Sequence, residues 1–256
     1  MCLVILAFGA HKDYPLLVAA NRDEFHARPT RKADWWPDAP DVVGGRDLQA
    51  GGTWLGAQRG GRFATVTNYS GAVEKSAGLR SRGHLVTDFL RGVQSPVEFL
   101  ETVNGDDYAG FNLLVTDGNS LAYLSNRGGG LRELPPGLYG LSNATLDEPW
   151  EKVERIRKRL LQLLDAGRVN ESQLLQLLGD RNKGPVDEVR TERLPFEIAH
   201  AVTAPFIVTA NYGTRCSTIV RAERNGRWSF KERRFNASGD NVGESGYSFN
   251  VGVNAD

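Results

Sequence analysis

The sequence lacks the features that mark disulfide-rich, metal-binding and nucleic-acid-binding proteins. Its 256 residues include only two cysteines, Cys2 and Cys216, which are too few for a disulfide framework and do not form a zinc site by themselves. Lysine plus arginine total 31, and so do aspartate plus glutamate, so no net charge favours a nucleic-acid partner. We therefore expect no bound metal and no nucleic acid, and we expect any cysteine chemistry to be thiol chemistry.

Long apolar runs are also missing. The apolar run at residues 2–10 is too short to cross a bilayer and has no basic segment before it, so it indicates neither a transmembrane helix nor a signal peptide. No repeat or low-complexity segment divides the chain, and its length fits one large domain. We expect a single domain over residues 1–256, in the cytoplasm and without stable membrane insertion. The tail from about residue 236 is rich in Gly, Ser and Asn and is expected to be mobile.

The apolar pattern predicts short strands separated by two pairs of helices. Strands are expected at 2–8, 14–20, 51–56, 62–67, 110–117, 120–125, 138–141, 205–210, 218–223 and 227–234. Helices are expected at 81–93, from 95 onward, at 149–167 and at 170–179, with irregular loops at 28–41 and 180–203. This order, with its hairpin turns, predicts an α/β (α+β) fold in which helices cover two stacked, mainly antiparallel sheets.

Two groups of large side chains have no clear role in this pattern. The adjacent Trp35 and Trp36 lie in an expected loop, where they form either a substrate wall or part of the packing. Four basic residues on the helix at 149–167 are interpreted as a solvated face, namely Lys152, Arg155, Lys158 and Arg159.

The second residue, Cys2, is the strongest candidate for chemistry. If Met1 is removed, which a small second residue favours, Cys2 carries both a thiol and a free α-amino group. These groups titrate near pH ~8.5 and ~8, so nucleophile and base would share one residue. The alternative is that Cys2 only packs at the start of a buried strand, because free cysteine is among the most buried residue types.

A polar tetrad, Asn21-Arg22-Asp23-Glu24, follows the second apolar run directly. If the runs at 2–8 and 14–20 pair as a hairpin, the tetrad lies beside Cys2. A solvated turn is the alternative, because Asn and Asp are common turn residues. Cationic or amide-rich surroundings of this kind are expected to lower the pKa of the Cys2 thiol.

These motifs together resemble the NRDE family, whose eukaryotic members are called transport and Golgi organisation 2 proteins. The resemblance rests on motifs between residue 2 and about residue 220, namely Cys2, Asn21-Arg22-Asp23-Glu24, Gly51-Gly52-Thr53-Trp54, Thr67-Asn68-Tyr69, Leu141-Ser142-Asn143 and Tyr212-Gly213-Thr214-Arg215. That family in turn resembles the cysteine branch of the N-terminal nucleophile hydrolases, which includes choloylglycine hydrolases and penicillin V acylases. The implied fold is the four-layer αββα sandwich.

The resemblance also implies a catalytic set. Cys2 matches the nucleophile, Asp23 the aspartate that contacts it, and Asn68 and Asn143 the groups that support the oxyanion. Arg215 is a weaker match to an arginine near the site. Those acylases usually place an arginine just before the Asn-x-Asp segment, where this chain has Ala20, so Arg22 is the alternative. Further side chains are expected to contact the substrate, namely Asn21, Glu24, Trp54 and Tyr69.

The implied activity is hydrolysis or acyl transfer at an amide or thioester bond of a small acylated substrate, without a cofactor. A non-enzymatic carrier of haem, lipid or acyl-CoA on the same fold is the alternative, because eukaryotic family members have been linked to haem handling and lipid metabolism. A haem carrier would need an apolar groove, and an axial ligand would hold the haem iron. The four histidines show no clustered spacing and rank second to the thiol as functional residues, namely His11, His26, His84 and His200.

Overall fold

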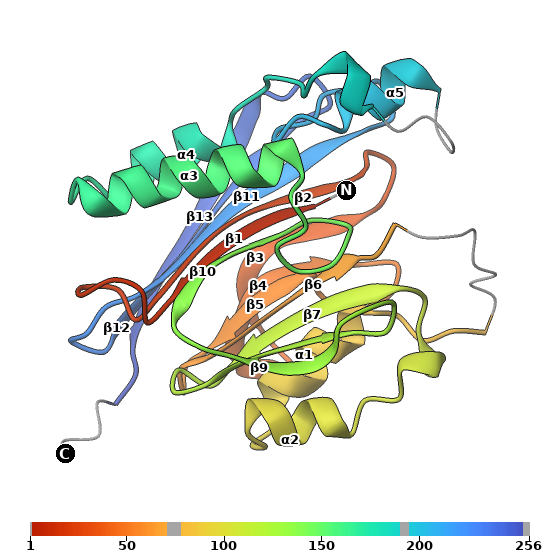
Figure 1. Ribbon diagram of the computed structural model, residues 1–256. Coiled ribbons are helices and arrows are strands. Elements are labelled where there is room, and N and C mark those ends of the chain that lie inside the picture. The colour runs from red at the N-terminus through yellow and green to blue at the C-terminus, as the bar shows by residue number, and fades with distance from the viewer. Residues whose placement is uncertain (1, 71–77, 190–194, 253–256) are drawn as a thin grey trace.

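The computed structural model describes residues 2–70, 78–189 and 195–252, and it arranges them in four layers (Figure 1). Two antiparallel sheets face each other in the middle. Helices α3 (Glu151–Asp165) and α4 (Glu171–Leu178) cover the outside of one sheet, and α1 (Gly83–Arg91) and α2 (Pro96–Glu101) cover the outside of the other. The predicted αββα sandwich is confirmed. Expectations for Met1, for Gly71, for residues 190–194 of a loop and for residues 253–256 of the tail lie outside the described residues.

The first sheet carries the chain start between its hairpin partner and a strand that is distant in sequence. Its strand order is β10-β1-β2-β11-β12-β13. The bounds are β10 Gly137–Leu141, β1 Leu3–Phe8, β2 Leu16–Phe25, β11 Tyr212–Ala222, β12 Arg227–Phe235 and β13 Asn241–Asn250. Strand β1 is therefore hydrogen-bonded to β2 on one side and to β10 on the other.

The second sheet is a simple meander of seven strands. Its order is β3-β4-β5-β6-β7-β8-β9. The bounds are β3 Thr30–Trp36, β4 Ala39–Asp47, β5 Leu55–Gln58, β6 Arg62–Asn68, β7 Phe111–Thr116, β8 Leu121–Ser125 and β9 Gly130–Leu134. Each strand pairs with its sequence neighbours, so local hairpins build this layer.

The continuous apolar run of β1 follows from its burial on both faces. Val4 and Leu6 belong to the core between the two sheets, whereas Leu3 and Ile5 belong to the core under α3 and α4. Strand side chains alternate between faces, so a strand covered on both sides needs apolar residues at every position. A third core lies between the second sheet and helices α1 and α2.

The helix predictions are confirmed with small changes in their ends. The capping box at Ser95 and Glu98 is present at the start of α2, where each side chain bonds the backbone of the other residue. The segment expected as a loop at 180–203 contains two short helical turns, at Val186–Glu188 and Phe196–Ala201 (α5), which its charged sequence concealed.

The expected loop at 28–41 is wrong, because these residues form most of the β3–β4 hairpin. Pro37 lies in the tight turn, which explains why proline there does not interrupt pairing. Trp36 is buried and its Nε1 donates to the Gly44 carbonyl at 3.0 Å. The Trp35 ring packs edge-on against Tyr247, so this pair serves the packing.

Two expectations about the last third of the chain are also wrong. Residues 205–210 are not a strand. Phe206 and Ile207 are buried in an irregular segment, and β11 begins at Tyr212. The expected mobile tail from 236 instead forms β13, which pairs with β12 along its length. Its alternating polar residues face outward at a sheet edge, and polarity alone suggested mobility.

We predict that Gly140→Ala disrupts the packing of α3 against the first sheet and lowers the stability of the protein. A Cβ at Gly140 would overlap Val153 of α3, so the helix must shift. Overpacking of this kind costs about 1–3 kcal/mol of the free energy of unfolding. The control is Gly246→Ala in β13, where a new Cβ meets its nearest atom at an ordinary 3.6 Å. Urea unfolding would measure both variants, and equal stability would contradict this packing.

Candidate active site

Cys2 lies one residue before β1, at the open end of the strand. Its backbone N–H donates to Asn143 Oδ1 at 2.9 Å. Its Sγ lies 4.0 Å from the backbone carbonyl oxygen of Asp23. Leu3 pairs with Asn21 in the β1–β2 ladder, so Cys2 lies opposite Arg22. The hairpin predicted from sequence therefore does bring the tetrad beside Cys2.

Asn143, which follows β10 after Ser142, joins the two sheets at this point. Its Oδ1 accepts from Cys2 in the first sheet, while its Nδ2 donates to the carbonyl of Asn68, at the end of β6 in the second, at 2.7 Å. Its own carbonyl accepts from the Ser70 N–H at 2.7 Å. The Ser142 hydroxyl donates to the Cys2 carbonyl at 2.7 Å. Asn143 is buried, so these bonds fix its amide with little freedom.

A buried polar network that sequence reasoning missed supports the loop carrying Asn143. Asn112 donates from Nδ2 to Thr67 Oγ1 at 3.2 Å and to the Ala144 carbonyl at 2.9 Å. The Tyr123 hydroxyl donates to Asn112 Oδ1 at 2.7 Å and accepts from the Leu146 N–H at 3.2 Å. Fully bonded buried networks are rigid. The only signal in the sequence was a polar residue, Asn112, within an apolar strand.

Asp23 is buried with half of its carboxylate unbonded. Thr214 Oγ1 donates to Oδ1 at 2.7 Å, whereas Oδ2 has no hydrogen-bond partner among the described residues. Burial raises the pKa of Asp23 to about 6, although the positive charges of Lys152 and Arg22 act in the opposite direction. This carboxyl therefore changes its protonation state close to neutral pH.

Strand alternation sends the members of the tetrad in different directions, because all four lie within β2 and not in a turn. Asn21 and Asp23 face the helix layer and Arg22 faces the second sheet. The Asn21 amide is fully used, since Nδ2 donates to two carbonyls, of Leu178 and Pro205, and Oδ1 accepts from Ser217. Asn21 thus ties the sheet to the helices, a role different from the predicted substrate contact.

The remaining tetrad residue, Glu24, forms ion pairs near the surface. Its Oε2 lies 3.7 Å from Arg22 and 3.8 Å from Arg28. Asn68 is exposed at the end of β6, and the neighbouring Tyr69 is half-buried. Asn68 is thus close to Asn143 through its own carbonyl and has an exposed side chain.

Three predicted site residues line one cavity of about 130 Å³ between the sheets, namely Arg22, Trp54 and Arg215. The Arg22 guanidinium lies 4.3 Å from the centre of the Trp54 ring and donates to Thr30 Oγ1 at 3.2 Å. Arg215 donates from one nitrogen to the carbonyls of Phe25, His26 and Arg28 and holds the chain after β2. Of these three residues, Arg22 is the one that lies opposite Cys2 in the β1–β2 register.

The Cys2 thiol is not activated by its surroundings in the way the sequence suggested. Burial raises its pKa, the positive charge of the chain's N-terminus lowers it, the negative charge of Asp23 raises it further, and Arg22 lowers it to the smallest extent. The expected lowering is therefore wrong, because removal of the thiol from water outweighs both nearby positive charges. Proton removal by an adjacent base becomes more important for reactivity at such a site.

Lys152 is a second buried polar residue near Cys2 that the sequence did not identify. It was expected on a solvated face, but it is only 2% exposed, and its Nζ donates to the Val202 carbonyl at 2.9 Å. Burial lowers its pKa, and its positive charge interacts with both Asp23 and Cys2. The residue lies one position before Val153 on the inner face of α3. A lysine directly beside the apolar stripe was the available signal.

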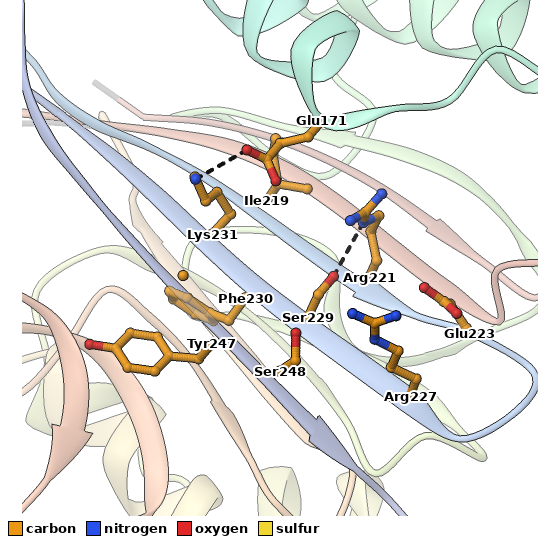
Figure 2. Close-up of a pocket in the computed structure, with 11 residues that line it drawn as sticks. Glu171, Ile219, Arg221, Glu223, Arg227, Ser229, Phe230, Lys231, Tyr247 and Ser248 are labelled. Carbon is orange, nitrogen blue, oxygen red and sulfur yellow. Dashed lines mark hydrogen bonds and ion pairs between the residues drawn. The ribbon is translucent and has the colours of Figure 1, made fainter.

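The described residues contain no group of three or more His, Cys, Asp or Glu that could hold a metal ion. None of the helices in the described ranges has the length and apolarity needed to span a bilayer. A further cavity of about 240 Å³ lies on the outer side of β11, β12 and β13 (Figure 2). Its lining includes Glu171, Arg221 and Lys231 but none of the predicted site residues.

Sequence comparison finds relatives over nearly the whole chain. A model of a family described as "Transport and Golgi organisation 2" matches residues 1–237. The Transport and Golgi organization protein 2 homolog of Bos taurus is 34% identical over 258 residues, which cover 91% of this chain and 92% of that protein. The homolog of Homo sapiens is 32% identical over 256 residues, with the same coverage.

Structure comparison finds the fold in a hydrolase. The C2A mutant of conjugated bile acid hydrolase from Clostridium perfringens superimposes with a TM-score of 0.53 at 10% identity. The match covers 100% of this chain and 99% of that chain. At this identity the likeness shows the fold alone, which is that of the N-terminal nucleophile hydrolases.

We predict that Asp23→Asn stabilises the protein at neutral pH. Because the pKa of Asp23 rises on folding from about 3.8 to about 6, the folded state holds a proton that the unfolded state releases between these values. Stability contributed by this group therefore falls as pH rises from about 4 to 6, by a total of about 3 kcal/mol. Urea unfolding at pH 4 and pH 7 should show that the free energy of unfolding of the variant exceeds that of the wild type only at pH 7. Asp41→Asn, an exposed strand position, is the control. An equal effect at both pH values would be inconsistent with a raised pKa.

We also predict that Lys152→Met slows alkylation of Cys2. Loss of the buried positive charge removes an attraction for the thiolate, so the pH profile of the reaction with iodoacetamide moves to higher pH. A rise of about one unit in the pKa of the thiol lowers the fraction of thiolate about tenfold at a fixed pH below that pKa. Lys158→Met, on the exposed side of α3, should leave the profile unchanged. Identical profiles for both variants would remove Lys152 from the site.

Proposed function

The chain belongs to the Transport and Golgi organisation 2 family, and from that premise we propose that it is an acyl-transfer enzyme with Cys2 as its nucleophile. It would cleave the amide or thioester bond of a small acylated substrate and pass the acyl group to water or another acceptor. The supporting observation is the 2.9 Å contact between the Cys2 nitrogen and Asn143 Oδ1. This hydrogen bond positions the backbone nitrogen of Cys2, which becomes the α-amine when Met1 is removed.

In the proposed first step, the thiol proton moves to the α-amine and Sγ attacks the substrate carbonyl carbon. The tetrahedral intermediate collapses when the ammonium gives its proton to the departing nitrogen or sulfur, leaving a thioester on Cys2. A water molecule or another acceptor then attacks this thioester, with the amine taking its proton. The thiol is regenerated and the acyl product leaves.

Two asparagines support the negative charge that develops on the carbonyl oxygen. Asn143 Nδ2 carries two hydrogens and uses one for the Asn68 carbonyl. The second hydrogen, and the exposed amide of Asn68 beside it, are available to donate to an oxyanion. Because Asn143 is fixed by both sheets, its donor is oriented before the substrate arrives.

Asp23 and Lys152 tune the amine and thiol in this mechanism. Ionised Asp23 favours the ammonium form of the amine, as the third member of a triad favours the charged form of its base. Buried Lys152 opposes the effect of Asp23 on the thiol, since its charge attracts both anions. The pair thus lets Cys2 ionise without an unbalanced buried negative charge.

The alternative is the haem, lipid or acyl-CoA carrier. Each histidine already bonds the backbone, with His26, His84 and His200 contacting carbonyls at 2.9 to 3.1 Å and His11 accepting from an N–H at 3.2 Å. The cavity between the sheets is also smaller than the ~300–1,000 Å³ common for drug-sized ligands. No contact in the described part of the chain favours the carrier over the enzyme.

We predict that Cys2→Ala abolishes turnover of N-acyl amides and acyl thioesters, and that Asn143→Ala lowers kcat by about 10²-fold, because an oxyanion donor is lost. Asn225→Ala, in the β11–β12 turn, is the control and should keep full activity. Full turnover by Cys2→Ala would contradict the role of Cys2 as the nucleophile. Saturable haem binding without any acyl product would favour the carrier, and Cys2→Ala or single His→Ala variants would then locate the axial ligand.

A further inference from the structure

Four side chains form a row across the first sheet, on the face that looks toward the second sheet. Cys2 lies opposite Arg22, Arg22 pairs with Cys216, and Cys216 pairs with Arg234. Neighbouring strands lie about 4.8 Å apart, so Cys216 is roughly 10 Å from Cys2. Arg22 lies between the two cysteines, and its positive charge acts on both thiols. The row therefore runs directly from the nucleophile into the cavity.

The cavity of about 130 Å³ that begins at Arg22 and follows this row is lined by several basic residues. Five basic side chains line it, from both sheets and the β-bulge of β11, namely Arg22, Arg31, Lys32, Arg215 and Arg234. Within the described ranges, Arg31 and Lys32 form no ion pair. Glu232 supplies the single carboxyl of the lining.

Glu232 is committed to other groups and does not neutralise the cavity. It is 1% exposed, its Oε1 accepts the Ala33 N–H at 2.8 Å, and the same oxygen lies 3.6 Å from Arg234. The buried thiol of Cys216 also bonds to it. Arg22 is already paired with Glu24 at 3.7 Å, and Arg215 donates to backbone carbonyls, so Arg31, Lys32 and Arg234 are the cations left to attract an anion. Guanidinium groups bind carboxylate, sulfonate and phosphate oxygens with paired hydrogen bonds.

The size and lining of the cavity indicate which part of a substrate would enter it. Apolar side chains are few in the lining, namely Trp54, Phe235 and Val242. A long acyl chain needs more apolar surface than this, whereas a compact charged group fits. The group must also be joined to the scissile carbonyl by a short link, because the cavity begins one strand away from Cys2.

We propose that this cavity binds the anionic end of the substrate's leaving group, a carboxylate, sulfonate or phosphate held by Arg234, Lys32 and Arg31 while the carbonyl lies at Cys2. This inference rests on the proposed acyl-transfer function and adds the chemical class of the leaving group. Arg22 links the two parts of the site, since it lies beside both the nucleophile and the cavity. Substrates with neutral leaving groups leave the cations unpaired and bind less well.

Three amides with one acyl chain test this directly, namely N-lauroyl taurine, N-lauroyl glycine and N-lauroyl ethanolamine. The two anionic amides should have a KM lower than the ethanolamide by roughly tenfold or more, the effect of one or two charge-assisted hydrogen bonds. Arg234→Gln and Lys32→Gln should raise KM for the anionic amides, leaving kcat and the ethanolamide nearly unchanged. Arg227→Gln, on the opposite face of β12, is the matched control. Turnover without preference among the three amides would overturn the inference.

A binding measurement separates failure of the cavity from failure of the chemistry. Fluorescence titration of the Cys2→Ala variant with N-lauroyl taurine and N-lauroyl ethanolamine needs no turnover. Tighter binding of the taurine amide, lost with Arg234→Gln in that background, supports the cavity even if no amide is ever cleaved. Equal affinity for the two ligands overturns it. Urea unfolding of Arg234→Gln and Lys32→Gln shows whether either variant binds less tightly only because it is misfolded. If one variant is misfolded, the comparison is made with the variant that folds.

Discussion

The candidate site depends on one side-chain amide, that of Asn143. Its oxygen holds the backbone of Cys2 in the first sheet, and its nitrogen holds the Asn68 carbonyl in the second. The chain start, the end of β6 and the end of β10 are thus fixed to one another by a single buried group. Both functions of an asparagine amide, acceptor and donor, are needed here, so neither aspartate nor leucine could replace it without leaving a partner unbonded.

Around this amide the protein keeps several charges away from water. Asp23, Lys152 and Arg22 are all buried, and each is only partly compensated by direct hydrogen bonds. Such an arrangement costs folding free energy and is found where a site must hold charges ready for a reaction. The raised pKa of Cys2 follows from the same burial. A thiol of this kind reacts when a base removes its proton inside the site.

Much of the fold could be predicted from sequence because it depends on local patterns. The apolar run of β1, the apolar stripe of α3 and the capping box of α2 each predict the element in which they occur. The strand content of 28–41 and of the tail could not be predicted, since Trp35 and Phe249 acquire their place only by packing against each other across the two sheets. Likewise, Asn21 through Glu24 extend β2 because β11 pairs with them from almost two hundred residues away.

The site was predictable in part for a similar reason. Cys2, Asp23 and Asn143 were identified from motifs and do converge. The burial of Lys152 depends on how α3 is seated, and the cationic cavity depends on strand register, neither of which a single sequence specifies. The difference between the directions of Arg22 and Asp23 follows from strand alternation only once the tetrad is known to lie in a strand.

The central claim is that Cys2 is the first residue of the working protein and carries the acyl group. Mass spectrometry of the purified chain, quenched during reaction with an acylated substrate, tests it most directly. We expect a chain without Met1 and an acyl mass on the peptide that begins at Cys2. An active protein that retains Met1, or an acyl group found only on another residue, would contradict it.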